Sequence, residues 1–96
     1  MNLEASDRGI TLVFGQNLNF NSLEESVKIY HRALGLKQHL LLQAKEVILV
    51  DAAGLQALLI FLNTLKNEGA SFEWQQASSN LKQVAELLGM KQLLAL

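Results

Sequence analysis

The sequence of 96 residues has no cysteine and no excess of basic side chains. Without cysteine the chain has no disulfide, no thiolate metal ligand and no cysteine nucleophile, and a cytoplasmic location is expected. The formal net charge of −1 lacks the basic bias that a nucleic-acid backbone demands. Nucleic acid is therefore not an expected partner.

Long apolar runs are missing as well. The longest mainly hydrophobic stretch, 47–62, contains Asp51 and Gln56 and is shorter than the roughly 20 residues that a spanning helix needs, so no membrane insertion is expected. The opening MNLEASDRG has no basic start followed by an apolar segment, so no signal peptide is expected. Half of the residues are hydrophobic and 18% are charged, which predicts a single small globular domain over 1–96.

Strand and helix patterns alternate along the chain. Compact or alternating apolar residues predict strands within 9–15, 39–44 and 70–76, and the tail 93–96 is a candidate edge strand. Helical periodicity predicts helices over 22–35, 52–67 and 78–89. This alternation is typical of an α/β fold in which helices cover a small sheet.

The ends of the first predicted helix are suggested by local signals. Ser22 is a candidate cap, Glu25 three residues later completes a capping box, and Gly35 is the expected stop. The apolar face of this helix is expected to carry Leu23, Val27, Tyr30 and Leu34.

Asp51 interrupts the apolar stretch between the strand-like segment and the helix that begins at Ala52. We expect its carboxylate to accept hydrogen bonds from the free N–H groups of that helix, where it also meets the positive end of the helix dipole. Gly54 in the first turn admits close approach by another backbone. Two explanations stay open: a capped helix on a core strand, or a functional turn at the carboxyl end of a strand.

The segment HLLLQAKEVILVDAAGLQALL, residues 39–59, resembles the signature of the STAS family, the domain of anti-sigma factor antagonists and sulfate transporters. The family motif, at the start of a helix, is read here as Asp51, Ala52, Ala53, Gly54 and Leu55. The likeness extends to Gly15 and to the later segments LKNEGASFEW and LKQVAELLGM. It implies a STAS-like α/β fold, with a four- to five-stranded sheet and helices packed against it. We call residues 51–54 the signature turn.

One departure from the family pattern concerns Ala52. In the antagonists that phosphorylation switches, the residue after the aspartate is a serine, whose phosphorylation releases the domain from a partner kinase. No hydroxyl occurs from His39 through Asn63. The resemblance therefore implies a binding module without that switch. Within the family, the sequence is most similar to small single-domain members associated with bacterial chemotaxis and signalling. The second most similar kind is a short cytoplasmic subunit of phospholipid-trafficking ABC transporters.

The predicted helix 52–67 has two apolar faces. One face, suited to packing on a sheet, carries Leu55, Leu58, Leu59, Leu62 and Leu65. The other carries Ala53, Ala57, Ile60 and Thr64, with Phe61 on its flank. A neighbouring helix of the same domain would explain the second face, and so would a contact surface for a partner.

Enzyme chemistry is not expected. Glu46 and Asp51 lie on either side of an apolar segment, so they do not form a catalytic carboxylate pair. His31 and His39 have no metal-ligand spacing, and no glycine-rich phosphate loop is present, so neither a metal nor a cofactor is expected.

The sequence thus predicts a non-enzymatic interaction domain that docks onto a regulatory protein, either an anti-sigma factor of the kinase-like kind or a chemotaxis component. The expected partner-binding residues are Asp51, Ala52, Ala53, Gly54, Ala57, Ile60, Phe61 and Thr64. A subunit that stabilises a transporter ATPase is one alternative, and a small-ligand or nucleotide sensor is another. Self-association is left open.

Overall fold

The computed structural model describes all residues, Met1–Leu96. A four-stranded sheet contains β1 (Asn2–Ser6), β2 (Gly9–Val13), β4 (Leu40–Ala44) and β6 (Phe72–Ala77), and a two-stranded one contains β3 (Asn17–Leu18) and β5 (Leu49–Val50). The helices are η1 (Phe20–Ser22), a short 3₁₀ turn, and α1 (Leu23–Leu36), α2 (Ala52–Asn67) and α3 (Ser79–Leu87). The α/β class predicted from the sequence is confirmed.

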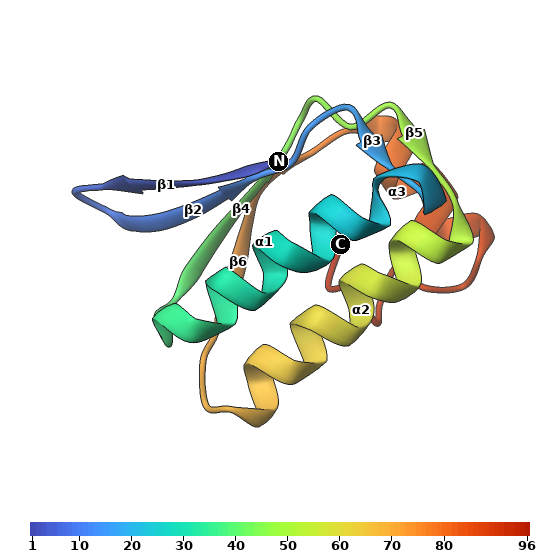
Figure 1. Ribbon diagram of the computed structural model, residues 1–96. Coiled ribbons are helices and arrows are strands. Elements are labelled where there is room, and N and C mark those ends of the chain that lie inside the picture. The colour runs from blue at the N-terminus through green and yellow to red at the C-terminus, as the bar shows by residue number, and fades with distance from the viewer.

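The larger sheet is mixed, in the order β1-β2-β4-β6. Strands β1 and β2 form an antiparallel hairpin, whereas β2, β4 and β6 are parallel neighbours, so the chain must cross over the sheet between them. Figure 1 shows α1 and α2 side by side on one side of this sheet, with the hairpin projecting beyond them. The smaller sheet pairs Leu18 with Val50 and lies at the end of the molecule where α2 begins.

The core lies between the larger sheet and the helices. Leu12, Leu42 and Trp74 stand opposite one another on adjacent strands, and the ring of Phe14 stacks on that of Trp74 at 5.9 Å between centroids. From the helices, the fully buried side chains include Leu55, Leu58, Leu62, Leu65 and Leu81. Burial of this kind contributes about 1.5–3 kcal/mol for each leucine.

Several elements agree with their sequence patterns. Helix α2 spans the predicted 52–67, and the three strands expected within 9–15, 39–44 and 70–76 form as β2, β4 and β6. Helix α3 begins after Ser78, whose hydroxyl accepts a hydrogen bond from the N–H of Leu81 at 3.1 Å.

The N-cap residue of α1 is Ser22, as predicted, but the predicted capping box with Glu25 and the predicted end at Gly35 are wrong. Ser22 makes no side-chain cap bond to α1; the capping box joins it to Asn19, where each side chain accepts from the other residue's N–H, at 3.1 and 3.2 Å. The helix continues through Gly35, and Lys37 takes the left-handed conformation after its end. The inward face is also shifted, because Val27 is exposed while Ser26, Tyr30 and Ala33 are buried.

The tail is not the edge strand that the sequence suggested. Residues 91–95 form turns, and Leu94 is fully buried. The indole N–H of Trp74 donates to the carbonyl of Leu94 at 2.8 Å. The tail therefore packs over the β6 end of the core, where a carbonyl acceptor satisfies the indole.

Candidate functional site

The signature turn is held by both carboxylate oxygens of Asp51. Its Oδ1 accepts from the N–H of Gly54 at 2.8 Å, which confirms the predicted helix cap. Its Oδ2 accepts from the N–H of Phe20 at 3.0 Å, and its own N–H donates to the carbonyl of Leu18 at 3.3 Å. Asp51 therefore fastens the start of α2 to the segment between β3 and α1.

Gly54 is required at this place by packing. A Cβ atom on Gly54 would lie 2.0 Å from the carbonyl oxygen of Leu18 and 2.9 Å from the nitrogen of Asn19. These are backbone atoms, which cannot rotate out of the way. The first turn of α2 thus lies directly on the backbone of β3, the close approach that the glycine suggested from the sequence.

The signature turn carries no charged side chain besides Asp51. Ala52 is exposed and Ala53 is half-buried. Phe20, whose N–H is bonded to Asp51, is 70% exposed, and Leu49, in the strand β5 that leads into the turn, is 56% exposed. Exposed apolar side chains that gather in one place mark interaction surfaces.

Phe20 and Leu49 were missed by the sequence reasoning. Leu49 lies in a continuous apolar segment, a pattern that predicts a buried residue. In the structure it is exposed because it belongs to the two-residue strand β5 at the surface. A signal was present for Phe20, because it is an isolated aromatic side chain within the polar stretch NLNFNS.

The remaining expected contact residues lie further along α2. Phe61 is buried, and its ring stacks on that of Tyr30 from α1, with 4.3 Å between centroids and 10° between planes. A neighbouring helix therefore covers Phe61. This is the first of the two explanations given above for the second apolar face of this helix. Ile60 is 66% exposed, so α1 leaves that part of the face open.

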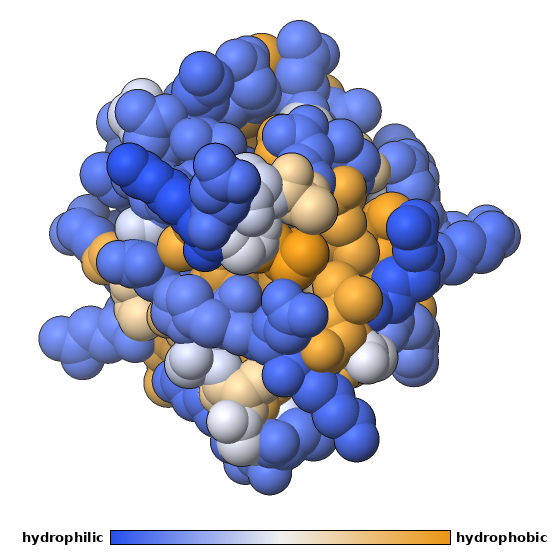
Figure 2. All heavy atoms as spheres, turned by 90° about the vertical axis from the view of Figure 1, so that its left-hand side faces the viewer, coloured by the Kyte–Doolittle hydropathy of each residue, from blue (hydrophilic) through white to orange (hydrophobic).

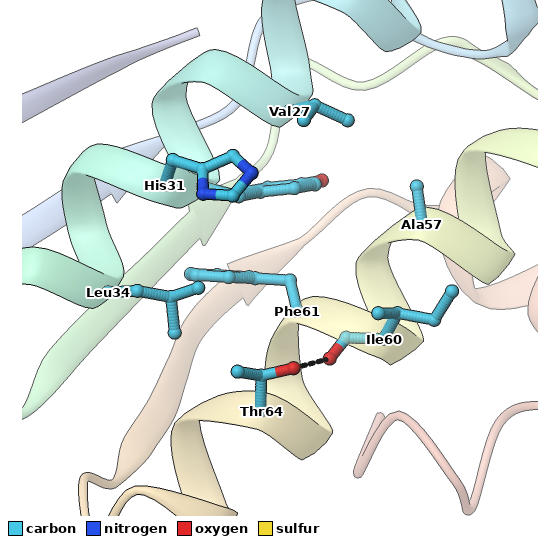
Figure 3. A pocket seen from close by; sticks show the side chains of 8 residues that line it. Val27, His31, Leu34, Ala57, Ile60, Phe61 and Thr64 are labelled. Atoms are coloured by element: carbon cyan, nitrogen blue, oxygen red, sulfur yellow. Dashed lines mark hydrogen bonds between the residues drawn. The ribbon is translucent and has the colours of Figure 1, made fainter.

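Between the two helices lies a groove of about 270 Å³, which we call the α1–α2 groove. It is lined by Val27, Tyr30, His31, Leu34, Ala57, Ile60, Phe61 and Thr64. Figure 3 shows the α1 side chains across from those of α2, with the hydroxyl of Thr64 donating to the carbonyl of Ile60 at 2.7 Å. On the side of the molecule that Figure 2 shows, the left-hand side of Figure 1, apolar atoms gather in the middle and right and are bordered by hydrophilic side chains.

One polar cluster lies away from the turn. Nδ1 of His39 is 2.7 Å from the hydroxyl oxygen of Ser71, and its Nε2 is 3.6 Å from a carboxylate oxygen of Glu73. All three side chains are exposed and stand where the parallel strands β4 and β6 begin, so the cluster links those strand starts. The structure contains no group of three or more His, Asp or Glu side chains placed to hold a metal ion.

Comparison with protein-family models, curated proteins and solved structures gives no match. Among the helices, none combines the length and the apolar character needed to cross a membrane.

The arrangement of the signature turn favours recognition by contact. Both oxygens of Asp51, its one charged group, already accept backbone hydrogen bonds, which leaves apolar side chains and helix surface on the outside. Such a surface can bury area against a partner.

Proposed function

We propose that this chain is a STAS-like, non-enzymatic interaction domain of the bacterial cytoplasm that docks onto a regulatory protein. The observation that carries the proposal is the exposure of Ala52, Phe20 and Leu49 on three segments that meet at Asp51, whose carboxylate binds the N–H groups of Phe20 and Gly54. The resemblance of 39–59 to the family signature supports the same surface. Ile60, two turns further along α2, is a further exposed apolar side chain on the same helix.

Residues 39–63 contain no hydroxyl side chain, so the signature turn cannot be phosphorylated on serine, threonine or tyrosine and stays in one charge state. Phosphate brings a charge of about −2, which disrupts an apolar interface. With Ala52 in the place of the acceptor, the turn keeps its apolar character, and docking is not controlled by a kinase at this position. Regulation then acts through the amount or state of the partner.

The test is binding by variants that place charge on this surface. Ala52→Asp and Ile60→Lys should each weaken affinity for the regulatory partner at least tenfold, about 1.4 kcal/mol, because the partner would desolvate an unpaired charge. The partner is recovered with the wild-type domain from the native cell and identified by mass spectrometry. Affinities are then measured with purified proteins by calorimetric titration.

Matched controls carry the same changes elsewhere. Ala5→Asp on β1 and Leu87→Lys on α3 alter exposed positions outside the docking surface and should bind as the wild type does. Circular dichroism should be unchanged in all four variants. Full affinity of both test variants would place the partner surface elsewhere, and specific recovery of a transporter ATPase would contradict the regulatory role.

A further inference from the structure

The polar cluster at the beginning of β4 and β6 is formed by the pairing of these strands. His39 comes directly before β4 and Ser71 directly before β6. Because Leu40 pairs with Phe72, these two residues stand opposite each other. Side chains alternate along a strand, so Glu73 lies on the same face as Ser71 and diagonally across from His39. The pairing therefore brings an imidazole, a hydroxyl and a carboxylate together on one face of the sheet.

Each nitrogen of the His39 ring has a different neighbour. Nδ1 lies at hydrogen-bond distance, 2.7 Å, from the hydroxyl oxygen of Ser71, and Nε2 lies 3.6 Å from a carboxylate oxygen of Glu73. When Nδ1 carries the proton and donates it to Ser71, the lone pair of Nε2 is free to bind an ion. Histidine ligands of metal sites are held in this way, with one nitrogen donating to an oxygen and the other bound to the metal.

The separation of the two candidate ligand atoms suits one bound ion. Bonds of about 2.0–2.2 Å to Zn²⁺, set at the tetrahedral angle, place two ligand atoms about 3.4 Å apart. Nε2 of His39 and the carboxylate oxygen of Glu73 are 3.6 Å apart, so a small adjustment brings both onto one ion. Imidazole nitrogen is a ligand for transition metals, whereas Mg²⁺ and Ca²⁺ prefer oxygen, so the pair favours Zn²⁺ over those two ions.

The carboxylate of Glu73 is available for a cation. His39 is its only ion-pair partner, and Arg8, which lines the same hollow, makes no ion pair. The side chains of His39 and Glu73 are 48% and 65% exposed, so water can occupy the remaining coordination positions. Two protein ligands and water hold an ion reversibly, unlike the four protein ligands of a structural zinc site.

We propose that His39 and Glu73 bind one Zn²⁺ ion, through Nε2 and a carboxylate oxygen, with water in the remaining positions. Ser71 is a positioning residue, because its hydroxyl accepts from Nδ1 and so orients the ring. The site lies where β4 begins, whereas the signature turn follows the carboxyl end of that strand. Zinc binding therefore does not depend on the docking partner.

The test is titration of the isotope-labelled chain, prepared without a histidine tag, with ZnCl₂ and observation by NMR. The chain has two histidines, so His31, exposed on α1, is an internal control. Imidazole signals of His39 should shift and saturate at one zinc per chain, those of His31 should not, and MgCl₂ should shift neither. Equal shifts of the two histidines, or His39 shifts that Mg²⁺ reproduces, would overturn the site.

Calorimetric titration of variants tests each ligand. His39→Ala should abolish zinc binding, and His31→Ala, the same change on α1, should leave it unchanged. Glu73→Gln keeps the size of the side chain but removes its charge and should weaken binding. Glu68→Gln, at the exposed end of α2, is the matched control and should bind zinc as the wild type does. Unchanged affinity in His39→Ala or Glu73→Gln would overturn the site.

Ser71→Ala tests the positioning role. Loss of the group that orients a metal-binding histidine typically weakens affinity about 10–100-fold, and we expect about tenfold here. Ser71→Thr keeps a hydroxyl and should restore the affinity of the wild type. Circular dichroism should be unchanged in these variants, because the substituted side chains are exposed. Equal zinc affinity in the wild type and Ser71→Ala would overturn the role of the hydroxyl.

Discussion

Asp51 shows at the scale of one residue how a local interpretation falls short. As a helix cap it needs one oxygen, and the sequence predicted that bond to the first turn of α2. The other oxygen accepts from Phe20, which is 31 residues earlier. Nothing in the pattern around Asp51 indicates this second bond, because it depends on the pairing of β3 with β5.

The second bond changes what substitution should do. Asn ranks beside Asp as a cap, but its amide has a single acceptor oxygen, so Asp51→Asn should lose one of the two bonds and about 1 kcal/mol of the free energy of unfolding. Asp51→Ala should lose both, about 2–3 kcal/mol. Urea denaturation measures both variants. Wild-type stability in Asp51→Asn would mean that the bond to Phe20 contributes nothing.

At the scale of elements, the contact between α2 and β3 depends on the missing side chain of Gly54. Helix propensity alone would make alanine better than glycine there by about 1 kcal/mol. The structure reverses that sign, since the new Cβ would lie 2.0 Å from a carbonyl oxygen. Relief requires the helix and the small sheet to separate.

We therefore expect Gly54→Ala to lower the free energy of unfolding by about 3 kcal/mol or more, as severe overpacking does. Gly35→Ala is the matched control, because Gly35 lies within α1 with no atom in the way of a Cβ. It should raise stability by about 0.5–1 kcal/mol. Thermal and urea unfolding distinguish the two, and a stabilised Gly54→Ala would contradict the close packing.

Some helices and strands could be predicted from the sequence and others could not. The bounds of α2 and α3 follow from periodicity and from caps within four residues, so the sequence contains them. The start of α1 after Ser22 was predicted, but its capping box was not, because Asn19 and Ser22 pair in a turn before the helix and leave Glu25 out. The tail was mispredicted because its apolar residues pack on Trp74 without joining the sheet. Strand β1 has an exposed, mainly polar sequence and gave no signal.

At the scale of the whole molecule, Tyr30 links the two helices that cover the sheet. The groove could not be predicted from the sequence, because it depends on the stacking of Tyr30 with Phe61 from another helix. The sequence did indicate that one face of α2 was unusually apolar, and it left open whether a helix or a partner covers that face. The structure shows α1 covering Phe61 and leaving Ile60 exposed.

The burial of Tyr30 predicts a loss of global stability in alkali. Its pKa is raised in the folded protein, so above the ordinary value of about 10 the unfolded chain releases the phenolic proton first, and stability falls by up to about 1.4 kcal/mol per pH unit. Tyr30→Phe lacks this contribution. Urea unfolding of both proteins at about pH 9 and pH 11 should show a steeper decline in the wild type. Parallel declines would contradict the buried state.

Tyr30 is the only tyrosine, which simplifies the measurement. Absorbance of the phenolate then reports one group, and in the folded protein its ionisation should occur well above the ordinary pKa of tyrosine. Lysine titration affects both proteins alike, so the comparison with Tyr30→Phe removes it.

The central place of β4 has a consequence for synthesis. Its Leu40 pairs with Ile10 on one side and with Phe72 on the other, so both neighbours are far along the chain and two long loops must close. During translation β2 and α1 exist before β6 emerges, and the apolar edge of β4 is unpaired in that interval. Free strand edges template association with other chains. The nascent chain is therefore most vulnerable to aggregation between the emergence of β4 and that of β6.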